Sequence, residues 1–206
     1  MEENKCRICS SRSLVSINIF KNVKKCLKCN MCFNLNEVKV DYENYTTFDT
    51  SDKERKIWEN FAQRDYNLIC NFLSTKRIES ILDFGSGYGY LSEKIESKND
   101  IKVYNHELNH SMLVDMKKRG LKILNSENKK VDVVILNHCL EHIKDPVNIL
   151  NLIKDKYDPN YLIFFQTNYK GFIPRYLPLL WYGWSHNQHY YHFTPKTLFY
   201  IIKNIY

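Results

Sequence analysis

The sequence predicts an α/β protein in which a Rossmann-like, doubly wound, mostly parallel sheet follows a small amino-terminal zinc ribbon. Three features of the 206-residue chain support this: two Cys-x-x-Cys pairs near the start, a glycine-rich turn at 85–89, and an apolar, β-branched run at 131–136. Hydrophobic residues make up 44% of the chain, enough for one small module and one domain with its own core. We expect the ribbon at 1–40, a helical connector at 41–75 and the α/β domain at 76–206.

The glycine-rich turn follows an apolar strand that contains Asp83. Glycines at positions 85, 87 and 89 lack side chains, so the backbone can approach a ligand closely. A dinucleotide-binding turn would place its third glycine at position 90, where the chain has Tyr90. A phosphate-binding P-loop would continue with lysine and a hydroxyl residue, and neither follows Gly89. Both phosphate-binding patterns are therefore excluded.

A second carboxylate follows the next predicted strand. Residues 101–107 alternate like a short strand and end at Glu107, 24 positions after Asp83 (107 − 83). In doubly wound sheets an acidic residue about 20 positions after the first turn binds ribose hydroxyls, and one helix from Tyr90 to about Ser97 fills the interval. The alternative is that Asp83 caps this helix and Glu107 is a solvated loop residue.

The remaining elements follow from apolar patterns and capping residues. The run at 131–136 is typical of a strand buried on both faces of a parallel sheet and is predicted as the fourth strand, and 160–167 supplies a fifth. Between them, Asp145 and Pro146 suit the N-cap and first position of a helix. Apolar positions from Asp52 to Ser74 predict one helix or two, covering the first strand.

Three stretches resemble a known family. Residues 83–89 (Asp-x-Gly-x-Gly-x-Gly) are similar to the first motif of class I S-adenosylmethionine-dependent methyltransferases. Residues 140–146 are similar to the Leu-Glu-His-x-x-Asp-Pro signature of a subgroup that includes ubiquinone-type O-methyltransferases. Residues 189–198 resemble that subgroup's His-x-Tyr-x-Phe-Thr-Pro-Lys-x-Leu stretch, so the resemblance covers roughly 76–202. Sugar C-methyltransferases similar to these carry a small zinc ribbon before the catalytic domain.

The resemblance implies a cytoplasmic methyltransferase acting on a small-molecule acceptor, with a sugar or nucleotide-sugar of surface-polysaccharide biosynthesis favoured. The S-adenosylmethionine-binding residues that it implies are Asp83, Gly85, Ser86, Gly87, Gly89, Glu107, Asn137 and His138. An acceptor that carries a proton needs a general base, and imidazole titrates near neutral pH. We expect His142, His189 or His138 in this role, and for each a loop-ordering hydrogen bond is the alternative.

The resemblance to ubiquinone-type enzymes also implies magnesium at the Leu-Glu-His signature. Glu141 and His142 match the expected ligands. His138, however, stands where a carboxylate is expected, which favours either no metal or a softer one.

The amino-terminal region has the cysteine spacing of a structural zinc site, with ligands Cys6, Cys9, Cys26 and Cys29. Four thiolates close a tetrahedral site and leave no position for water, so the ion would stabilise the ribbon rather than catalyse. Disulfides are the alternative, but seven cysteines is an odd number and no signal peptide is recognisable. Cys32 could substitute for one ligand.

Charge and hydropathy narrow the possible partners. The net charge of +7 raises the question of whether the chain binds nucleic acid. Its lysines, however, are spread along the whole chain rather than clustered in one stripe, so we expect a small acceptor instead. No apolar run reaches the roughly 18 residues of a membrane span.

The aromatic, proline-interrupted segment 172–184 is expected to form a hydrophobic lid over the acceptor, or alternatively a loop packed on its own aromatics.

The short carboxyl-terminal region leads to two further expectations. A complete class I domain continues with two more strands, whereas this sequence stops at Tyr206. We therefore expect the fifth strand to be an open edge and to pair with a second copy in a homodimer. The alternative function is a non-catalytic cofactor- or nucleic-acid-binding protein derived from a truncated methyltransferase.

Overall fold

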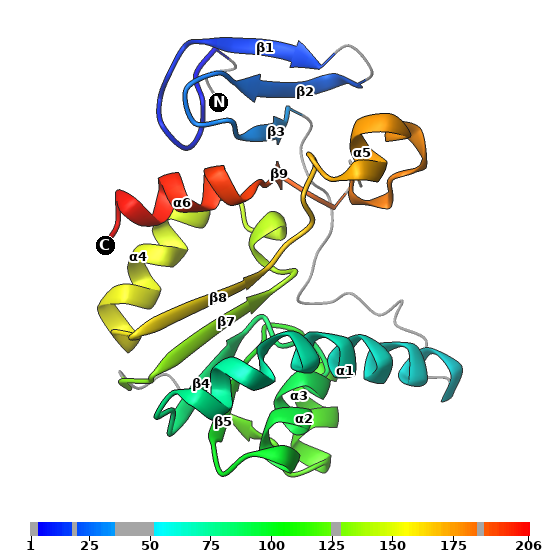
Figure 1. Ribbon diagram of the computed structural model, residues 1–206, viewed down its shortest axis with the longest axis vertical. Coiled ribbons are helices and arrows are strands. Elements are labelled where there is room, and N and C mark those ends of the chain that lie inside the picture. The colour runs from blue at the N-terminus through cyan, green and yellow to red at the C-terminus, as the bar shows by residue number, and fades with distance from the viewer. Residues whose placement is uncertain (1–3, 18–19, 36–51, 125–128, 185–187) are drawn as a thin grey trace. The chain divides into compact units, whose positions relative to one another are not determined.

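The computed structural model describes residues 4–17, 20–35, 52–124, 129–184 and 188–206. The chain forms two compact units (Figure 1). The first unit comprises 1–40, 138–152 and 166–206, and the second comprises 41–137 and 153–165. Residues 36–51, where the predicted ribbon ends and the predicted connector begins, lie outside the described residues.

A five-stranded parallel sheet is the centre of the second unit, with strand order β6-β5-β4-β7-β8. Its strands are β4 (Ser80–Phe84), β5 (Lys102–His106), β6 (Lys122–Ile123), β7 (Val133–Asn137) and β8 (Tyr161–Phe165). The strand order reverses between β4 and β7, so the predicted Rossmann-like, doubly wound sheet is confirmed. Ligands bind outside the carboxyl ends of the strands at such a reversal.

Most predicted elements of this unit are observed. A single helix, α1 (Asp52–Thr75), occupies the segment predicted as one helix or two. The helix α2 (Tyr90–Lys98) connects β4 and β5, as the spacing of the two carboxylates predicts. The sequence did not predict α3 (His110–Lys118) or the two-residue strand β6, because neither has a long apolar pattern.

Two helices cover one face of this sheet. The buried residues of that core come from α1 (Ala62, Ile69, Leu73), α2 (Leu91, Ile95) and alternate positions of the strands (Ile81, Val103, Val133, Ile135). Burying each of the large aliphatic side chains contributes about 1.5–3 kcal/mol. The predicted packing of α1 over the first strand of the sheet is therefore confirmed, and it fixes the carboxyl ends of the strands in space.

An antiparallel sheet of order β1-β2-β3-β9 organises the first unit. It contains β1 (Leu14–Ile17), β2 (Phe20–Cys26), β3 (Cys32–Asn34) and β9 (Tyr191–His192). Cys32 pairs with His192 and Phe33 with Tyr191, and all four of these residues are buried. The sequence did not predict this pairing, which joins the ribbon to a strand near the other end of the chain.

The other elements are helical. They are η1 (Leu140–His142), α4 (Pro146–Tyr157), α5 (Phe172–Tyr176), η2 (Pro178–Leu180), η3 (Tyr182–Trp184) and α6 (Pro195–Lys203). Asp145 accepts a hydrogen bond from the Asn148 amide at 3.0 Å, so the predicted helix start there is confirmed. Thr194 likewise caps α6, because its hydroxyl accepts from the Thr197 amide at 3.2 Å. Among the described residues, no helix has the length and apolar character needed to cross a membrane.

Candidate functional site

The glycine-rich turn is bound to the end of the neighbouring strand. The amides of Gly85 and Ser86 both donate to the His106 carbonyl, at 2.8 and 3.1 Å. The Gly87 amide donates to Glu107 Oε2 at 2.8 Å. The structure therefore brings the predicted turn and the predicted second carboxylate together at the carboxyl ends of β4 and β5.

Two positions of the turn require glycine for different reasons. Gly87 has a φ of +57° with open space where a side chain would begin, so a ligand can approach its backbone. Gly89 has a φ of +69°, and a Cβ there would lie only 2.8 Å from the side chains of Met116 and Leu121. Gly87 thus leaves room for a ligand, whereas Gly89 permits close packing of the turn.

Glu107 is held in place by three backbone amides. Besides Gly87, its carboxylate accepts from the amides of Leu108 at 2.7 Å and Asn109 at 2.9 Å. The Gly87 amide, which could bind a phosphate oxygen in other glycine-rich turns, donates here to a carboxylate of the protein. The carboxylate of Glu107 repels an anion, so the turn favours a neutral or positively charged ligand group.

Asp83 is a buried carboxyl group with one oxygen available. Its Oδ2 accepts from the Ser92 hydroxyl at 2.9 Å, and its Oδ1 has no hydrogen-bond partner among the described residues. Burial raises the pKa of Asp83 to about 7; the Ser92 hydrogen bond opposes this, and the charge of Glu107 adds to it. Asp83 does not cap α2, because the N-cap residue of that helix is Gly89.

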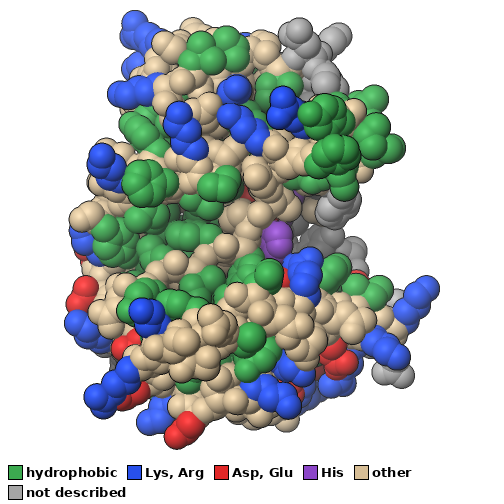
Figure 2. Space-filling view, viewed as in Figure 1, with side chains coloured by type: hydrophobic (Ala, Val, Ile, Leu, Met, Phe, Trp, Pro, Cys, Tyr) green, Lys and Arg blue, Asp and Glu red, His purple; other side chains and the backbone are tan. Residues whose placement is uncertain are grey.

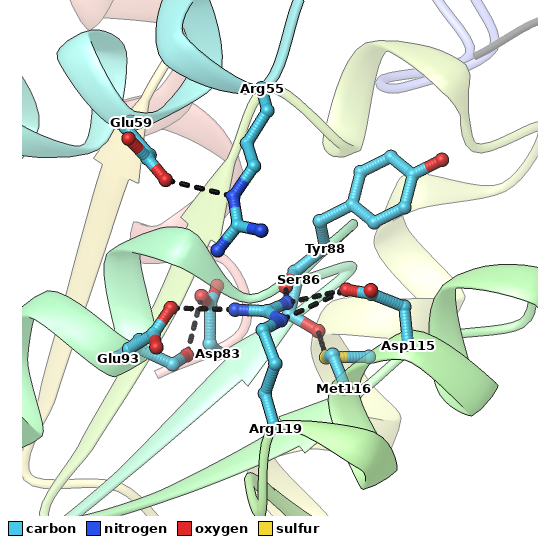
Figure 3. A network of polar contacts seen from close by, with 10 residues as sticks. Arg55, Glu59, Asp83, Ser86, Tyr88, Glu93, Asp115, Met116 and Arg119 are labelled. Carbon is cyan, nitrogen blue, oxygen red and sulfur yellow. Dashed lines mark hydrogen bonds and ion pairs between the residues drawn. The ribbon is translucent and has the colours of Figure 1, made fainter. Parts of the chain in front are cut away.

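Arg119 fixes the turn from outside, a role that its sequence position did not indicate. Its guanidinium donates to Glu93 at 2.6 Å, to Asp115 at 2.9 Å and to the Tyr88 carbonyl (Figure 3). The guanidinium also lies over the Tyr90 ring, 4.8 Å from its centroid. An arginine at a helix end is common in sequences, so only the three-dimensional contacts distinguish this one.

Asn137 ends β7 at the strand-order reversal, as its predicted cofactor role requires. Its Nδ2 donates to Asp65 Oδ2 of α1 at 3.1 Å, and its Oδ1 is buried without a partner among the described residues. Asp65 is itself buried and is paired with Arg64 at 2.7 Å. The role of Asp65 was not predicted either, because Asp65 lies in a helix predicted from its apolar positions alone.

A second group of polar residues lies in the first unit. The imidazoles of His142 and His189 meet edge to face, with ring centroids 4.7 Å apart. Ligand atoms of these histidines and of Glu141 all lie within 4.8 Å of one another. The structure thus brings together two of the three predicted general bases, which are 47 positions apart in the sequence (189 − 142).

The charge states in this group differ from those of exposed residues. Burial opposes ionisation of Glu141, but hydrogen bonding with His138 and the charge of His142 outweigh it, so the pKa of Glu141 lies below its usual value. Burial, aided by the charge of His142, lowers the pKa of His189, which favours a neutral ring. His138 is half-exposed, with Nδ1 3.4 Å from Glu141 Oε1 and a φ of +49°.

The four predicted zinc ligands form a compact group in the first unit. The Sγ atoms of Cys6 and Cys29 are 3.6 Å apart, and those of Cys9 and Cys26 are 3.5 Å apart. Zinc–sulfur bonds of about 2.3 Å place tetrahedral ligands about 3.8 Å apart, so this geometry fits zinc. No disulfide joins the described cysteines, and Cys32 lies in β3 outside the group.

The aromatic segment has an inner and an outer part. Trp184 and Trp181 pack with Val23 and Tyr169 in the core of the first unit. The apolar side chains around α5 are instead exposed, and they form a continuous apolar patch in Figure 2. They are Phe172, Ile173, Tyr176, Leu177, Leu179 and Leu180.

Comparison with known proteins places these features in a family context. The family model described as a methyltransferase domain matches residues 57–204. A solved magnesium protoporphyrin IX methyltransferase (ChlM) from Synechocystis PCC 6803 with bound SAH is 14% identical and has a TM-score of 0.55, covering 78% of this chain and 80% of that chain. The same enzyme with bound SAM is 13% identical and has a TM-score of 0.52, covering 78% and 76%. These two likenesses show the fold. No curated protein matches the sequence.

The raised pKa of Asp83 predicts a pH-dependent loss of stability. Between the usual aspartate pKa near 4 and the native value near 7, the folded protein holds a proton that the unfolded chain releases, so stability falls as pH rises. The free energy of unfolding, measured by urea denaturation at pH 5 and pH 8, should fall over this range by about 2–3 kcal/mol more for the wild type than for Asp83→Asn. Asp100→Asn, at an exposed aspartate, is the matched control and should follow the wild type; an Asp83→Asn profile parallel to the wild type would contradict this prediction.

Proposed function

The chain belongs to the methyltransferase domain family and is an S-adenosylmethionine-dependent enzyme, and we propose that its acceptor is a sugar or nucleotide-sugar of surface-polysaccharide biosynthesis. The observation that best supports the cofactor site is the pair of carboxylates, Asp83 and Glu107, beside the glycine-rich turn. The negative charge of Glu107 suits a ligand that carries a sulfonium cation and no phosphate.

The residues proposed to hold the cofactor are Asp83, Gly85, Ser86, Gly87, Gly89, Glu107, Asn137 and His138. Glu107 would accept hydrogen bonds from ribose hydroxyls, as carboxylates at this position do in doubly wound folds. Asp83 Oδ1 and Asn137 Oδ1 are buried oxygens without partners among the described residues, so both can accept hydrogen bonds from a ligand. Bound S-adenosylmethionine supplies a methyl group activated by its positively charged sulfur.

The residues proposed for proton transfer are His142, His189 and His138. A carbonyl oxygen accepts from Nδ1 of His142 and another accepts from Nδ1 of His189, so each ring presents Nε2 as its basic nitrogen. The depressed pKa of His189 keeps that nitrogen unprotonated at neutral pH. Such a base can take the proton of an acceptor hydroxyl as the methyl group is transferred.

The proposed acceptor class is supported by the surface of the first unit. Sugar rings pack their apolar faces on aromatic side chains, and Phe172 and Tyr176 are both exposed beside further apolar residues of α5 and η2. The four-cysteine ribbon is the other supporting feature, since the sugar C-methyltransferases that this sequence resembles carry such a module.

Cofactor binding is tested by calorimetric titration of the full chain with S-adenosylmethionine and S-adenosylhomocysteine. Glu107→Gln should weaken binding by about 10–100-fold, because a hydrogen bond to a charged acceptor contributes about 1.5–3 kcal/mol. Glu79→Gln removes an exposed glutamate of the same unit and should bind like the wild type. Wild-type protein that binds neither compound, or equal affinities for Glu107→Gln and the wild type, would sink the proposed site.

We also propose that Cys6, Cys9, Cys26 and Cys29 bind one structural zinc ion. Hydrogen bonding with Cys29 lowers the pKa of Cys6, which favours the thiolate form that binds metal. Because the ribbon is too small to fold around a core of its own, Cys26→Ser should lose this zinc and the native circular dichroism of the β1–β3 ribbon. Cys70→Ser, in α1, should retain the metal; zinc content measured by plasma mass spectrometry decides between these outcomes.

The remaining proposals concern location and assembly. Reduced cysteine ligands persist in the cytoplasm, where we place the enzyme. We propose a homodimer formed along the outer edge of β8, the last strand in the sheet order of the described residues. Analytical ultracentrifugation should give twice the chain mass of 24.7 kDa, and a monomer at micromolar concentration would contradict the proposal.

A further inference from the structure

Glu141, His142 and His189 have the arrangement of metal ligands. They come from two distant segments, η1 and the stretch just before β9, yet their ligand atoms lie within 4.8 Å of one another. Backbone hydrogen bonds fix both segments, because the Tyr190 amide donates to the Glu141 carbonyl at 2.8 Å and the Asn34 amide donates to the Tyr190 carbonyl at 2.9 Å.

Both histidines are oriented as metal-binding histidines are. His142 Nδ1 lies 3.0 Å from the Gln188 carbonyl oxygen, and His189 Nδ1 lies 3.0 Å from the Gly183 carbonyl oxygen. A carbonyl can only accept, so each Nδ1 carries the proton and each Nε2 carries the lone pair. Metal-ligating histidines typically donate their second ring nitrogen to a backbone carbonyl or carboxylate in this way, which fixes the tautomer and the ring.

Glu141 completes the group with an anionic oxygen. The residue is only 1% exposed, and its Oε1 lies near His138 Nδ1. Its Oε2 is buried without a hydrogen-bond partner among the described residues. A buried carboxylate oxygen left unpaired costs free energy, so this atom requires a cation or a donor that the described side chains do not supply.

The donor types indicate which ions fit. Two imidazole nitrogens and one carboxylate suit divalent transition metals such as zinc, iron or cobalt, whereas magnesium prefers an octahedron of oxygens. His138 is not part of this group, so the magnesium arrangement that the Leu-Glu-His resemblance implies does not fit these residues. The third ligand is instead His189, which comes from outside that signature.

We propose that Glu141 Oε2 and the Nε2 atoms of His142 and His189 bind one divalent transition-metal ion, separate from the four-cysteine site. Three protein ligands leave at least one coordination position for water or for an acceptor hydroxyl, which the ion would make more acidic. A bound ion would occupy the Nε2 atoms of His142 and His189, so the ion rather than these rings would then promote loss of the acceptor proton. The effect of the ion on the acceptor hydroxyl rests on the proposed function, but metal binding itself does not.

The test titrates full-length protein whose cysteine site has first been filled with one equivalent of zinc. Cobalt(II) is then added, and its visible absorption and bound amount are measured after dialysis. The wild type should take up one further equivalent, with visible ligand-field bands and without the sulfur-to-cobalt band of a thiolate site. Glu141→Gln and His189→Gln should each weaken this uptake by about 100-fold or more, since loss of even an outer-sphere partner costs 10–100-fold.

His110→Ala removes an exposed histidine of α3 and is the matched control, expected to take up cobalt like the wild type. Wild-type protein that binds no second ion overturns the proposal, whether or not the variants fold. Folded Glu141→Gln and His189→Gln variants that bind cobalt as tightly as the wild type also overturn it. If either variant unfolds, paramagnetic shifts of the His142 and His189 ring protons in the cobalt-loaded wild type decide instead, and unshifted signals count against the site. Titration with S-adenosylhomocysteine, run in parallel, reports separately on the cofactor site.

Discussion

The first unit depends on the pairing of β3 with β9. Three strands and four cysteines make up the ribbon, and β9 adds a fourth strand together with Tyr191, which is buried beside Phe33. Two backbone hydrogen bonds connect these strands to Glu141. The Asn34 amide donates to the Tyr190 carbonyl, and the Tyr190 amide donates to the Glu141 carbonyl. A zinc ion in the ribbon would therefore stabilise more than the ribbon, because the strand that it anchors also fixes the histidine and glutamate group.

In the second unit, two carboxyl groups lie close together beside the glycine-rich turn. Glu107 is stabilised by three backbone amides, whereas Asp83 is buried and, among the described residues, accepts only from the Ser92 hydroxyl. Arg119 adds positive charge close to the turn without occupying it, since its contacts are with Glu93, Asp115 and a backbone carbonyl (Figure 3). These contacts fix the shape of the turn.

Features encoded by short stretches of sequence were predictable, and those that depend on distant contacts were not. The strand-turn-helix around Gly85 to Gly89 and the caps at Asp145 and Thr194 follow from local residue preferences, and the structure agrees with them. The four cysteines were predictable because their spacing is itself the signal. In contrast, β9 has only two residues, too few for any periodicity, and its partner is determined by the register with β3.

The candidate site shows the same division. Asp83 and Glu107 could be assigned from their positions after successive strands, and the structure places them at one turn. The histidines could be named as candidates but not grouped, because nothing local relates position 142 to position 189. Arg119 and Asp65 act through contacts with other elements, so their sequence neighbourhoods resemble those of ordinary surface-helix residues.

The distance along the chain between β3 and β9 has a consequence for biosynthesis. Cys32 and His192 pair across 160 positions (192 − 32), and closing a flexible loop of that length costs about 4–5 kcal/mol of chain entropy. Translation at about 5–20 residues per second separates the appearance of the two strands by roughly 8–30 s. During this interval the nascent chain carries all four cysteines but no fourth strand, so the ribbon edge at β3 is exposed to other chains. If the cysteines bind zinc as proposed, metal binding early in synthesis would protect this edge against misassembly on the ribosome.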